Sequence, residues 1–299
     1  MNDAISHDAM SHDAMSHDAM SRDATSHGAK DVATMPALRS KSSGRSIRLA
    51  LGAFLVGGMS LLLASAAAGR DDGDGLWHVV HDLCLPMQRT LNHPFPCLDV
   101  NTQRGFVVLR APYDQTRLLV VPTRRVTGIE SPSLLQDNMP PLWSIGWRER
   151  GRVAEAAGKP LNWNDVGMAV NSQPRRTQDQ LHIHVDCVDP RLRRALAVKS
   201  SHLTSQWSTL DLAPWGDQYR VRSVSAAELD QNLFKLVADQ IPGARSEMGQ
   251  QSIAVVGLPD GQNQQRLALL VNSDAGHAEE LLDHSCMILR RQAAVRPGS

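Results

Sequence analysis

The sequence predicts an α+β fold in which an antiparallel β-sheet with flanking helices is followed by a C-terminal α+β extension. Short apolar runs that end at turn-forming residues indicate strands, and segments with apolar residues every three or four positions indicate helices. Strands and a helix in the order found here are typical of a sheet with antiparallel pairing. We place this domain at residues 76–290 of the 299-residue chain.

The first half of the domain contains a β-hairpin, a helix and two further strands. The hairpin turn is Ala111-Pro112-Tyr113-Asp114, and Gly158-Lys159-Pro160 ends the helix that follows. The predicted elements are, in order, a short helix (76–85), the two hairpin strands (105–110 and 117–121), a helix (140–157) and two strands (166–171 and 181–188).

The C-terminal third repeats this mixture of helices and strands. Its predicted elements are a helix (191–202), a strand (219–224), a helix (226–240), two strands (252–258 and 266–272) and a last helix (276–290). In the last helix Leu281, Leu282, Ser285 and Leu289 share one side with Cys286. Cys286 is therefore predicted to face the core, and His284 to lie on the surface of the helix.

The N-terminal 75 residues are not expected to belong to the folded domain. Residues 6–30 are five copies of a pentapeptide, whose period matches neither a helix nor a strand, so residues 1–34 are predicted to be disordered. Residues 35–48 form a basic segment that we expect to be cytoplasmic. Residues 291–299 are predicted to be a flexible tail.

Leu49–Gly69 is a run of 21 residues without a charge. At about 1.5 Å per residue a helix of this length spans roughly 30 Å, the thickness of a bilayer core. Lys41, Arg45 and Arg48 precede the run, so the chain after it is expected to face outward. A retained transmembrane anchor and a cleaved signal segment both fit, because Ala64-Ser65-Ala66 resembles a cleavage site.

The four cysteines and the charge balance restrict the compartment and the partners. All four cysteines follow the apolar run, in a compartment where disulfides persist. Of the three possible pairings, Cys84–Cys97 is preferred because it closes a short Pro-rich loop, which leaves Cys187–Cys286; free buried thiols are the alternative. The 31 basic and 31 acidic residues leave no basic excess for a nucleic acid.

Gln180–Cys187 (QLHIHVDC) alternates polar and apolar residues without interruption. Successive side chains of a strand point to opposite faces, so the apolar residues face the core and the polar ones share the other face. Those polar residues are Gln180, His182, His184 and Asp186. Neighbours on one face lie about 7 Å apart, so one imidazole can attack phosphorus while the other binds a phosphoryl oxygen. We therefore predict that His182 and His184 are catalytic.

The loop before this strand supplies hydrogen-bond donors for a phosphate. The predicted substrate-binding residues are Asn171, Arg175, Arg176, Thr177, Gln178 and Gln180. Arginine can hold a phosphate through two parallel hydrogen bonds, and Asn171 ends the preceding strand. The alternative for Arg175 and Arg176 is an exposed pair in a surface loop.

The sequence His-Ile-His-Val and its polar loop resemble the motif of the histidine-triad superfamily. In that superfamily the middle histidine is the nucleophile and forms a nucleotidyl-histidine intermediate. The resemblance implies that His182 is the nucleophile and that His184 takes the third position. Gln180 stands where the first histidine would be, and an amide cannot relay protons.

Four blocks in this order resemble the bacterial CDP-diacylglycerol pyrophosphatase family, over about residues 45–290. They are Pro122–Pro132, Asn171–Cys187, Pro242–Gly249 and Asp283–Leu289. The resemblance implies a histidine-triad-like fold and hydrolysis of CDP-diacylglycerol to CMP and phosphatidate, with no metal cofactor. Together with the apolar run and the positive residues before it, the resemblance predicts contact with membrane lipid at the bacterial inner membrane, in a single-pass protein whose catalytic domain is periplasmic.

Two other functions fit the same strand. A His-x-His pair suits zinc, with Asp186 or a distant histidine as the third ligand, which indicates a zinc-dependent envelope phosphodiesterase. Alternatively, the sheet binds a nucleotide or lipid without catalysis. Sensitivity to chelators distinguishes the first of these from a histidine nucleophile, and ligand binding without turnover identifies the second.

Overall fold

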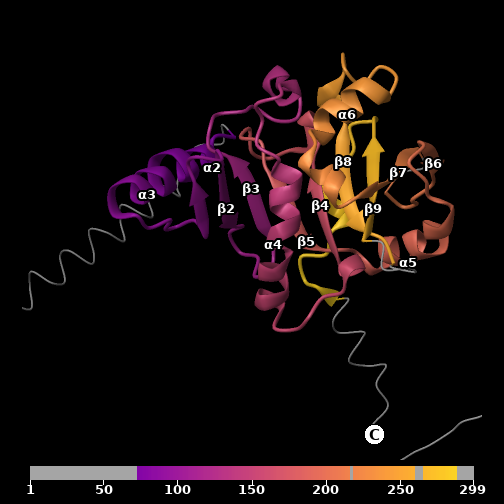
Figure 1. The fold of residues 1–299 in the computed structure, drawn as a ribbon, viewed down its shortest axis with the longest axis horizontal. Helices are drawn as coiled ribbons and strands as arrows, with labels where there is room; N and C mark the ends of the chain where they lie inside the picture. The colour runs from indigo at the N-terminus through magenta and orange to yellow at the C-terminus, as the bar shows by residue number, and fades with distance from the viewer. Residues whose placement is uncertain (1–72, 216–217, 260–264, 288–299) are drawn as a thin grey trace, which may run out of the picture. The chain divides into compact units, whose positions relative to one another are not determined.

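A computed structural model describes residues 73–215, 218–259 and 265–287 (Figure 1). It has the predicted α+β architecture, built on one nine-stranded sheet in the order β1-β2-β3-β5-β4-β8-β9-β7-β6. Every neighbouring pair in this order is antiparallel. Among the described residues no helix has both the length and the apolar character needed to cross a bilayer. The apolar run Leu49–Gly69, like the segments 1–34, 35–48 and 291–299, lies outside them.

The predicted strands are confirmed, with ends that differ by one or two residues. The strands are β1 (Asp99–Asn101), β2 (Phe106–Arg110), β3 (Leu118–Pro122), β4 (Val166–Val170), β5 (Ile183–Cys187), β6 (Ser208–Leu210), β7 (Tyr219–Ser225), β8 (Ser252–Gly257) and β9 (Arg266–Asn272). The sequence did not predict β1 and β6. Each has three residues and forms an edge of the sheet, so it carries too short a pattern to be recognised.

Most of the predicted helices are also confirmed. They are α2 (Gly75–His78), continued through the π-helical turn η1 (Val79–Cys84) into α3 (Leu85–Leu91), then α4 (Leu142–Ala157), α5 (Pro190–Lys199) and α6 (Leu233–Gln240). The predicted helix 226–240 is divided into the 3₁₀ turn η6 (Ala227–Asp230) and α6. The division occurs because the Asn232 side chain caps α6 by accepting a hydrogen bond from the Lys235 backbone.

The prediction of a last helix over 276–290 is wrong for the residues that can be compared. Ala278–Leu281 forms the 3₁₀ turn η8, and Leu282–Cys286 is not helical, so a continuous helix does not run through the described part of this range. Leu282 then forms a β-bridge with Val188, and the carboxylate of Asp283 accepts hydrogen bonds from the backbone of Ser285 and Met287. His284 consequently does not lie on a helix surface.

One face of the sheet is covered by α4, which lies in front of β3 and β5 in Figure 1. We call it the α4 face. A single cluster of buried side chains fills it, and Ile183, Val185 and Cys187 of β5 belong to this cluster, as predicted. Gly146 permits the close approach of the helix, since a Cβ there would lie 2.9 Å from Met168 Sδ.

The opposite face, which we call the divided face, carries two separate clusters. One lies between α2–α3 and strands β2 and β3, and includes Val80, Leu109 and Leu119. The other lies under α5 and includes Ala169 and Leu192. The polar side of β5 lies between them, because β5 is hydrogen-bonded to β3 on one side and to β4 on the other.

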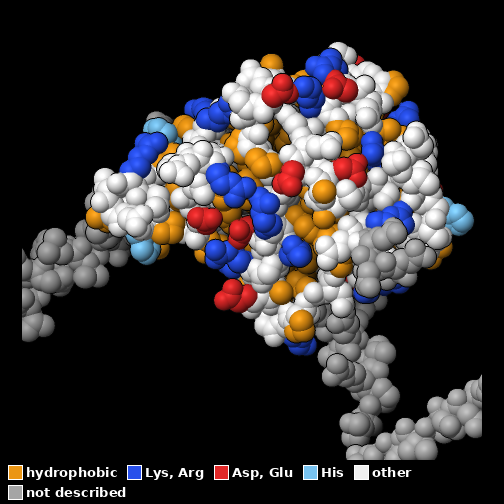
Figure 2. Space-filling view, viewed as in Figure 1, with side chains coloured by type: hydrophobic (Ala, Val, Ile, Leu, Met, Phe, Trp, Pro, Cys, Tyr) orange, Lys and Arg blue, Asp and Glu red, His pale blue; other side chains and the backbone are white. Residues whose placement is uncertain are grey.

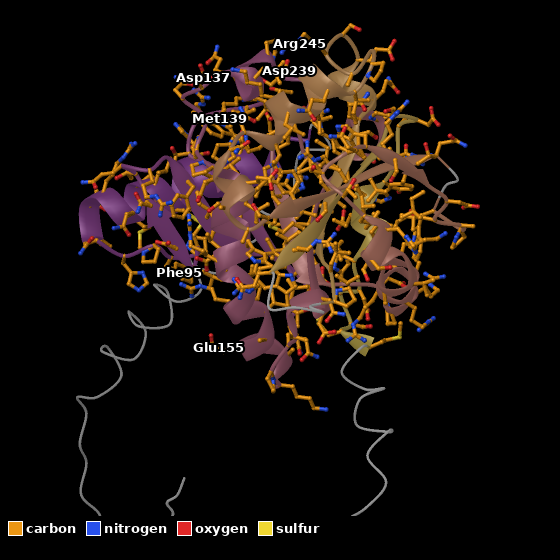
Figure 3. All side chains as sticks on the ribbon, turned by 45° about the vertical axis from the view of Figure 1, so that its right-hand side comes forward. Phe95, Asp137, Met139, Glu155, Asp239 and Arg245 are labelled. Atoms are coloured by element: carbon orange, nitrogen blue, oxygen red, sulfur yellow. A yellow bond between two sulfur atoms is a disulfide. The ribbon has the colours of Figure 1, made fainter. Side chains whose placement is uncertain are left out.

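Both preferred disulfides are present. Cys84–Cys97 closes the loop that carries the exposed Phe95 (Figure 3), and its Cα atoms are 5.7 Å apart. Cys187–Cys286 joins β5 to the C-terminal segment with a Cα separation of 5.3 Å. The alternative of free buried thiols is therefore wrong.

Salt bridges fix the loops at the edge where α6 ends. Lys235 Nζ of α6 lies 2.7 Å from Asp137 Oδ1, and Asp239 pairs with Arg245 at the same edge (Figure 3). Figure 2 shows basic and acidic side chains interspersed on the face seen from the α4 side. The mixture of both signs agrees with the neutral composition, which gives this face no large basic patch.

Candidate active site

The polar side of β5 opens into a pocket of about 400 Å³ on the divided face. Within the sheet, His184 lies between Leu119 of β3 and Ala169 of β4. The polar lining residues are Arg117, Thr177, Gln178, His182, His184 and Glu279. The apolar lining residues are Leu76, Val79, Leu109, Ala111, Pro112 and Leu119. The pocket thus combines a charged wall with an apolar wall that α2 and η1 help to form.

His182 is held in one tautomer by the backbone. Its Nδ1 lies 2.8 Å from the carbonyl oxygen of Gln180, two residues earlier. A carbonyl can only accept a hydrogen bond, so Nδ1 carries the proton and Nε2 keeps its lone pair. Burial lowers the pKa of His182, so the ring is neutral at pH 7. A neutral imidazole with a fixed, unprotonated Nε2 is a competent nucleophile.

His184 packs edge-on against His182, with ring centroids 4.6 Å apart at 70°. It is 5% exposed, and neither ring nitrogen has a hydrogen-bond partner among the described residues. Burial and the neighbouring His182 hold the pKa of His184 well below its usual range. A buried polar ring without partners is costly, which indicates that a ligand supplies them.

Glu279, from η8, is the most highly connected side chain of the pocket. Its carboxylate pairs with Arg117, accepts a hydrogen bond of 3.0 Å from Asn171 Nδ2, and lies 3.4 Å from His184 Nε2. Burial would raise its pKa, but hydrogen bonds from His277, His284 and Asn171 outweigh burial and hold the pKa of Glu279 well below its usual range. Glu279 is therefore a permanent anion and not a proton acceptor.

The predicted substrate-binding residues separate into two groups. Thr177 and Gln178 line the pocket, and Asn171 is bound to the lining residue Glu279 through both its amide oxygen and its amide nitrogen. Arg175 and Arg176 do not line this pocket. Arg175 donates to a backbone carbonyl, and Arg176 pairs with Glu130 and Asp179. A role in substrate binding remains a prediction for all five.

The side chain of Gln180 is buried and bonded to the backbone. Its amide oxygen accepts from the backbone of Val126 at 3.1 Å, and its amide nitrogen donates to the carbonyls of Pro122 and Arg124. These three hydrogen bonds tie the Gln180 side chain to the end of β3 and to the residues that follow it. The carbonyl of Gln180, rather than its side chain, reaches His182.

The carboxylate of Asp186, considered above as a third zinc ligand, is bonded to the Cys187 backbone and to His284. It is fully buried, and its Oδ2 lies 2.8 Å from Nδ1 of His284. In the described part of the chain, the group of potential ligands that includes Asp186 otherwise contains Cys187 and Cys286, whose sulfurs are bonded to each other. The arrangement of these residues does not favour the zinc interpretation.

Arg117, Glu279 and His284 were not predicted as site residues. Arg117 precedes β3, and the other two come from a segment predicted to be one helix. No local sequence motif marks any of these three residues as part of the site. Their proximity depends on the pairing of β3 with β5 and on the disulfide that returns the C-terminal segment to β5.

Comparison with known proteins agrees with this arrangement. The sequence model of the family "CDP-diacylglycerol pyrophosphatase" matches residues 71–290. The chain belongs to this family. It is also 39% identical over 238 residues to a CDP-diacylglycerol pyrophosphatase of Yersinia pestis, an alignment that covers 77% of this chain and 92% of the relative. The resemblance of the four sequence blocks is therefore confirmed, and membership in the pyrophosphatase family makes the chain a hydrolase.

Proposed function

We propose that this protein hydrolyses CDP-diacylglycerol to CMP and phosphatidate through a covalent cytidylyl-histidine. The observation that carries the proposal is the hydrogen bond from His182 Nδ1 to the Gln180 carbonyl, which leaves the Nε2 lone pair for the substrate. The match to the pyrophosphatase family supports the substrate. The apolar wall of the pocket, beside the charged wall, suits a substrate with a diphosphate next to a diacylglycerol.

The first step is an attack by His182 on the cytidylyl phosphorus. The Nε2 lone pair forms a P–N bond, and the P–O bond to phosphatidate breaks with its electron pair remaining on the phosphatidate oxygen. The imidazole becomes cationic in this step. The Gln180 carbonyl, which accepts from Nδ1, and the anionic Glu279 stabilise that charge.

The second step returns the enzyme to its starting state. Water attacks the same phosphorus, the P–N bond breaks, and CMP leaves with the release of one proton. His184 binds a phosphoryl oxygen in both steps, because its ring nitrogens have no partner among the described residues and lie at the pocket. A phosphate beside His184 favours the protonated ring, so His184 is expected to gain a proton when the substrate binds.

We further propose that residues 76–290 form a histidine-triad-like domain that lies outside the inner membrane. The alternating His182 and His184 motif supports the first statement. The positive residues before Leu49–Gly69 and the two disulfides of the domain support the second. In this arrangement the lipid substrate enters the pocket from the adjacent bilayer.

Intact-mass analysis of the enzyme quenched during turnover of CDP-diacylglycerol tests the mechanism. We expect a cytidylyl adduct on the wild-type chain and none on His182→Asn, whose kcat should fall by at least about 1,000-fold because the nucleophile is lost. His202→Asn, an exposed histidine outside the pocket, is the matched control and should behave as wild type. Wild-type turnover by His182→Asn would refute the assignment of the nucleophile.

A further inference from the structure

A chain of buried polar groups continues from the catalytic pocket into the molecule. Asp186 is the next polar residue of β5 after His184, and it is fully buried. Its Oδ1 accepts a hydrogen bond of 2.8 Å from the Cys187 backbone, and its Oδ2 lies 2.8 Å from His284 Nδ1. The proposed two-step reaction uses neither Asp186 nor His284.

His284 connects Asp186 to Glu279. Its second ring nitrogen, Nε2, lies 3.3 Å from Glu279 Oε1. Ionised carboxylates can only accept hydrogen bonds, so a ring that bonds both of them must donate from both nitrogens and must therefore be an imidazolium. Burial alone would lower the pKa of His284, but hydrogen bonds to Asp186 and Glu279 outweigh burial and raise the pKa to about 9.

Charged and titratable groups from three elements face the imidazolium. Asp186 and His184 come from β5, Glu279 comes from η8, and Arg117 precedes β3. On the outer side, His284 lines a second cavity of about 570 Å³ together with Asp114 and Lys159. Its side chain is 29% exposed there, so small solutes can reach it.

The Cys187–Cys286 disulfide holds this arrangement in place. Cys187 follows Asp186 directly, and Cys286 is two residues beyond His284. The β-bridge between Val188 and Leu282 aligns the same two segments. The C-terminal segment is thus fastened to β5 on both sides of His284.

We propose that His284 is a positioning residue that, as a cation between Asp186 and Glu279, fixes the Glu279 carboxylate beside His184. Glu279 in turn is bound to Asn171 and lies 3.4 Å from His184 Nε2, so its position fixes the negative charge that stabilises His184 when that ring gains a proton in the substrate complex. The inference rests on the proposed function, since it assigns His184 to the phosphoryl group. The deprotonated ring can donate to only one of the two carboxylates, so the arrangement weakens when His284 loses its proton.

Steady-state kinetics of His284→Gln across pH provides the first test. With a short-chain CDP-diacylglycerol we expect kcat at pH 7 to fall by at least about 10-fold while KM stays within about twofold, as is typical when the partner of a directly acting group is removed. The activity of the wild type should decline above about pH 9. This alkaline decline should be absent in His284→Gln and retained in the control His202→Gln.

Chemical rescue separates a positional role from a general loss of structure. In His284→Ala, imidazole added to the buffer can enter the outer cavity and restore part of the activity at pH 7. Pyrazole, which has a similar shape but is not protonated at this pH, should not restore it. Rescue by both solutes would show that filled volume, and not the cation, is required, and would overturn the proposal.

Nitrogen-15 NMR of the wild-type chain does not depend on any variant folding. We expect both ring nitrogens of His284 to be protonated up to about pH 9. Titration near the ordinary histidine value, or wild-type kcat with an unchanged alkaline limb in His284→Gln, would overturn the positioning role. Either result leaves the proposed function intact if the cytidylyl adduct still forms on His182. Absence of the adduct in the wild type would instead overturn the proposed function.

Discussion

The two faces of β5 carry different kinds of side chain, apolar on one face and polar on the other. On the α4 face, Ile183 and Val185 are fully buried and belong to one continuous apolar cluster. On the divided face, His182, His184 and Asp186 separate two smaller clusters. The same five-residue strand therefore supplies packing on one side and charged chemistry on the other. Adjacent residues of one strand can be selected for different properties, because their side chains never share an environment.

The difference is also energetic. Apolar side chains on the α4 face gain stability from burial, whereas His184 is buried without a hydrogen-bond partner among the described residues and therefore costs stability. We infer that the divided face is maintained at a loss of folding free energy. This inference leads to predictions in which the two faces respond in opposite ways to substitution.

Of the changes that compare the two faces, His184→Leu on the divided face is expected to have the largest effect. Removing a donor to the transition-state phosphoryl oxygens should lower kcat by between about 100- and 1,000-fold. The urea midpoint should be unchanged or higher, because an apolar side chain of similar size replaces a buried ring without partners. A clear loss of stability in this variant would contradict the comparison.

Ile183→Ala on the α4 face should have the opposite profile. Truncation of a fully buried Ile is expected to lower the free energy of unfolding by about 2 to 3 kcal/mol, while kcat of the folded enzyme stays close to wild type. Urea denaturation and kcat at low temperature measure the two quantities. Val198→Ala, at a position 75% exposed on α5, is the matched control and should change stability by less than about 0.5 kcal/mol.

The smallest effect is expected on removal of metal ions. Attack by His182 does not need a metal-activated water, so activity should survive exhaustive dialysis against EDTA and assay in its presence. This experiment tests whether the side chains of the divided face are sufficient for activity without a bound metal ion. Loss of activity that Zn²⁺ restores would favour the zinc-dependent phosphodiesterase considered from the sequence.

The sequence was sufficient for features that depend on a local period. The alternation over Gln180–Cys187 predicted both faces of β5, and the α4 helix followed from its apolar spacing and the glycine that ends it. Edge strands β1 and β6 escaped prediction since three residues do not establish a period. The last helix was predicted wrongly because Leu281, Leu282 and Cys286 have helical spacing, yet a β-bridge and a disulfide determine their positions.

The charged half of the site could not be predicted in this way. Arg117 and Glu279 come from two distant segments, and only the strand order and the C-terminal disulfide bring them together beside the predicted Asn171. Contact of Gln180 with the substrate stays a prediction, and the sequence did not indicate that its amide binds three backbone groups. A glutamine amide can hydrogen-bond to a substrate or to the protein backbone, so the residue type alone does not show which of the two it binds.

The three hydrogen bonds of Gln180 have a consequence for how the chain must pair during folding. A slip of β5 by one residue against its neighbours would move both histidines into the apolar cluster and place Ile183 and Val185 in the pocket. Gln180 anchors the strand at one end, and the cystine of Cys187 anchors it at the other. Because a strand shifted by one residue would lose the nucleophile and the core together, a molecule misaligned in this way would be inactive and unstable at once.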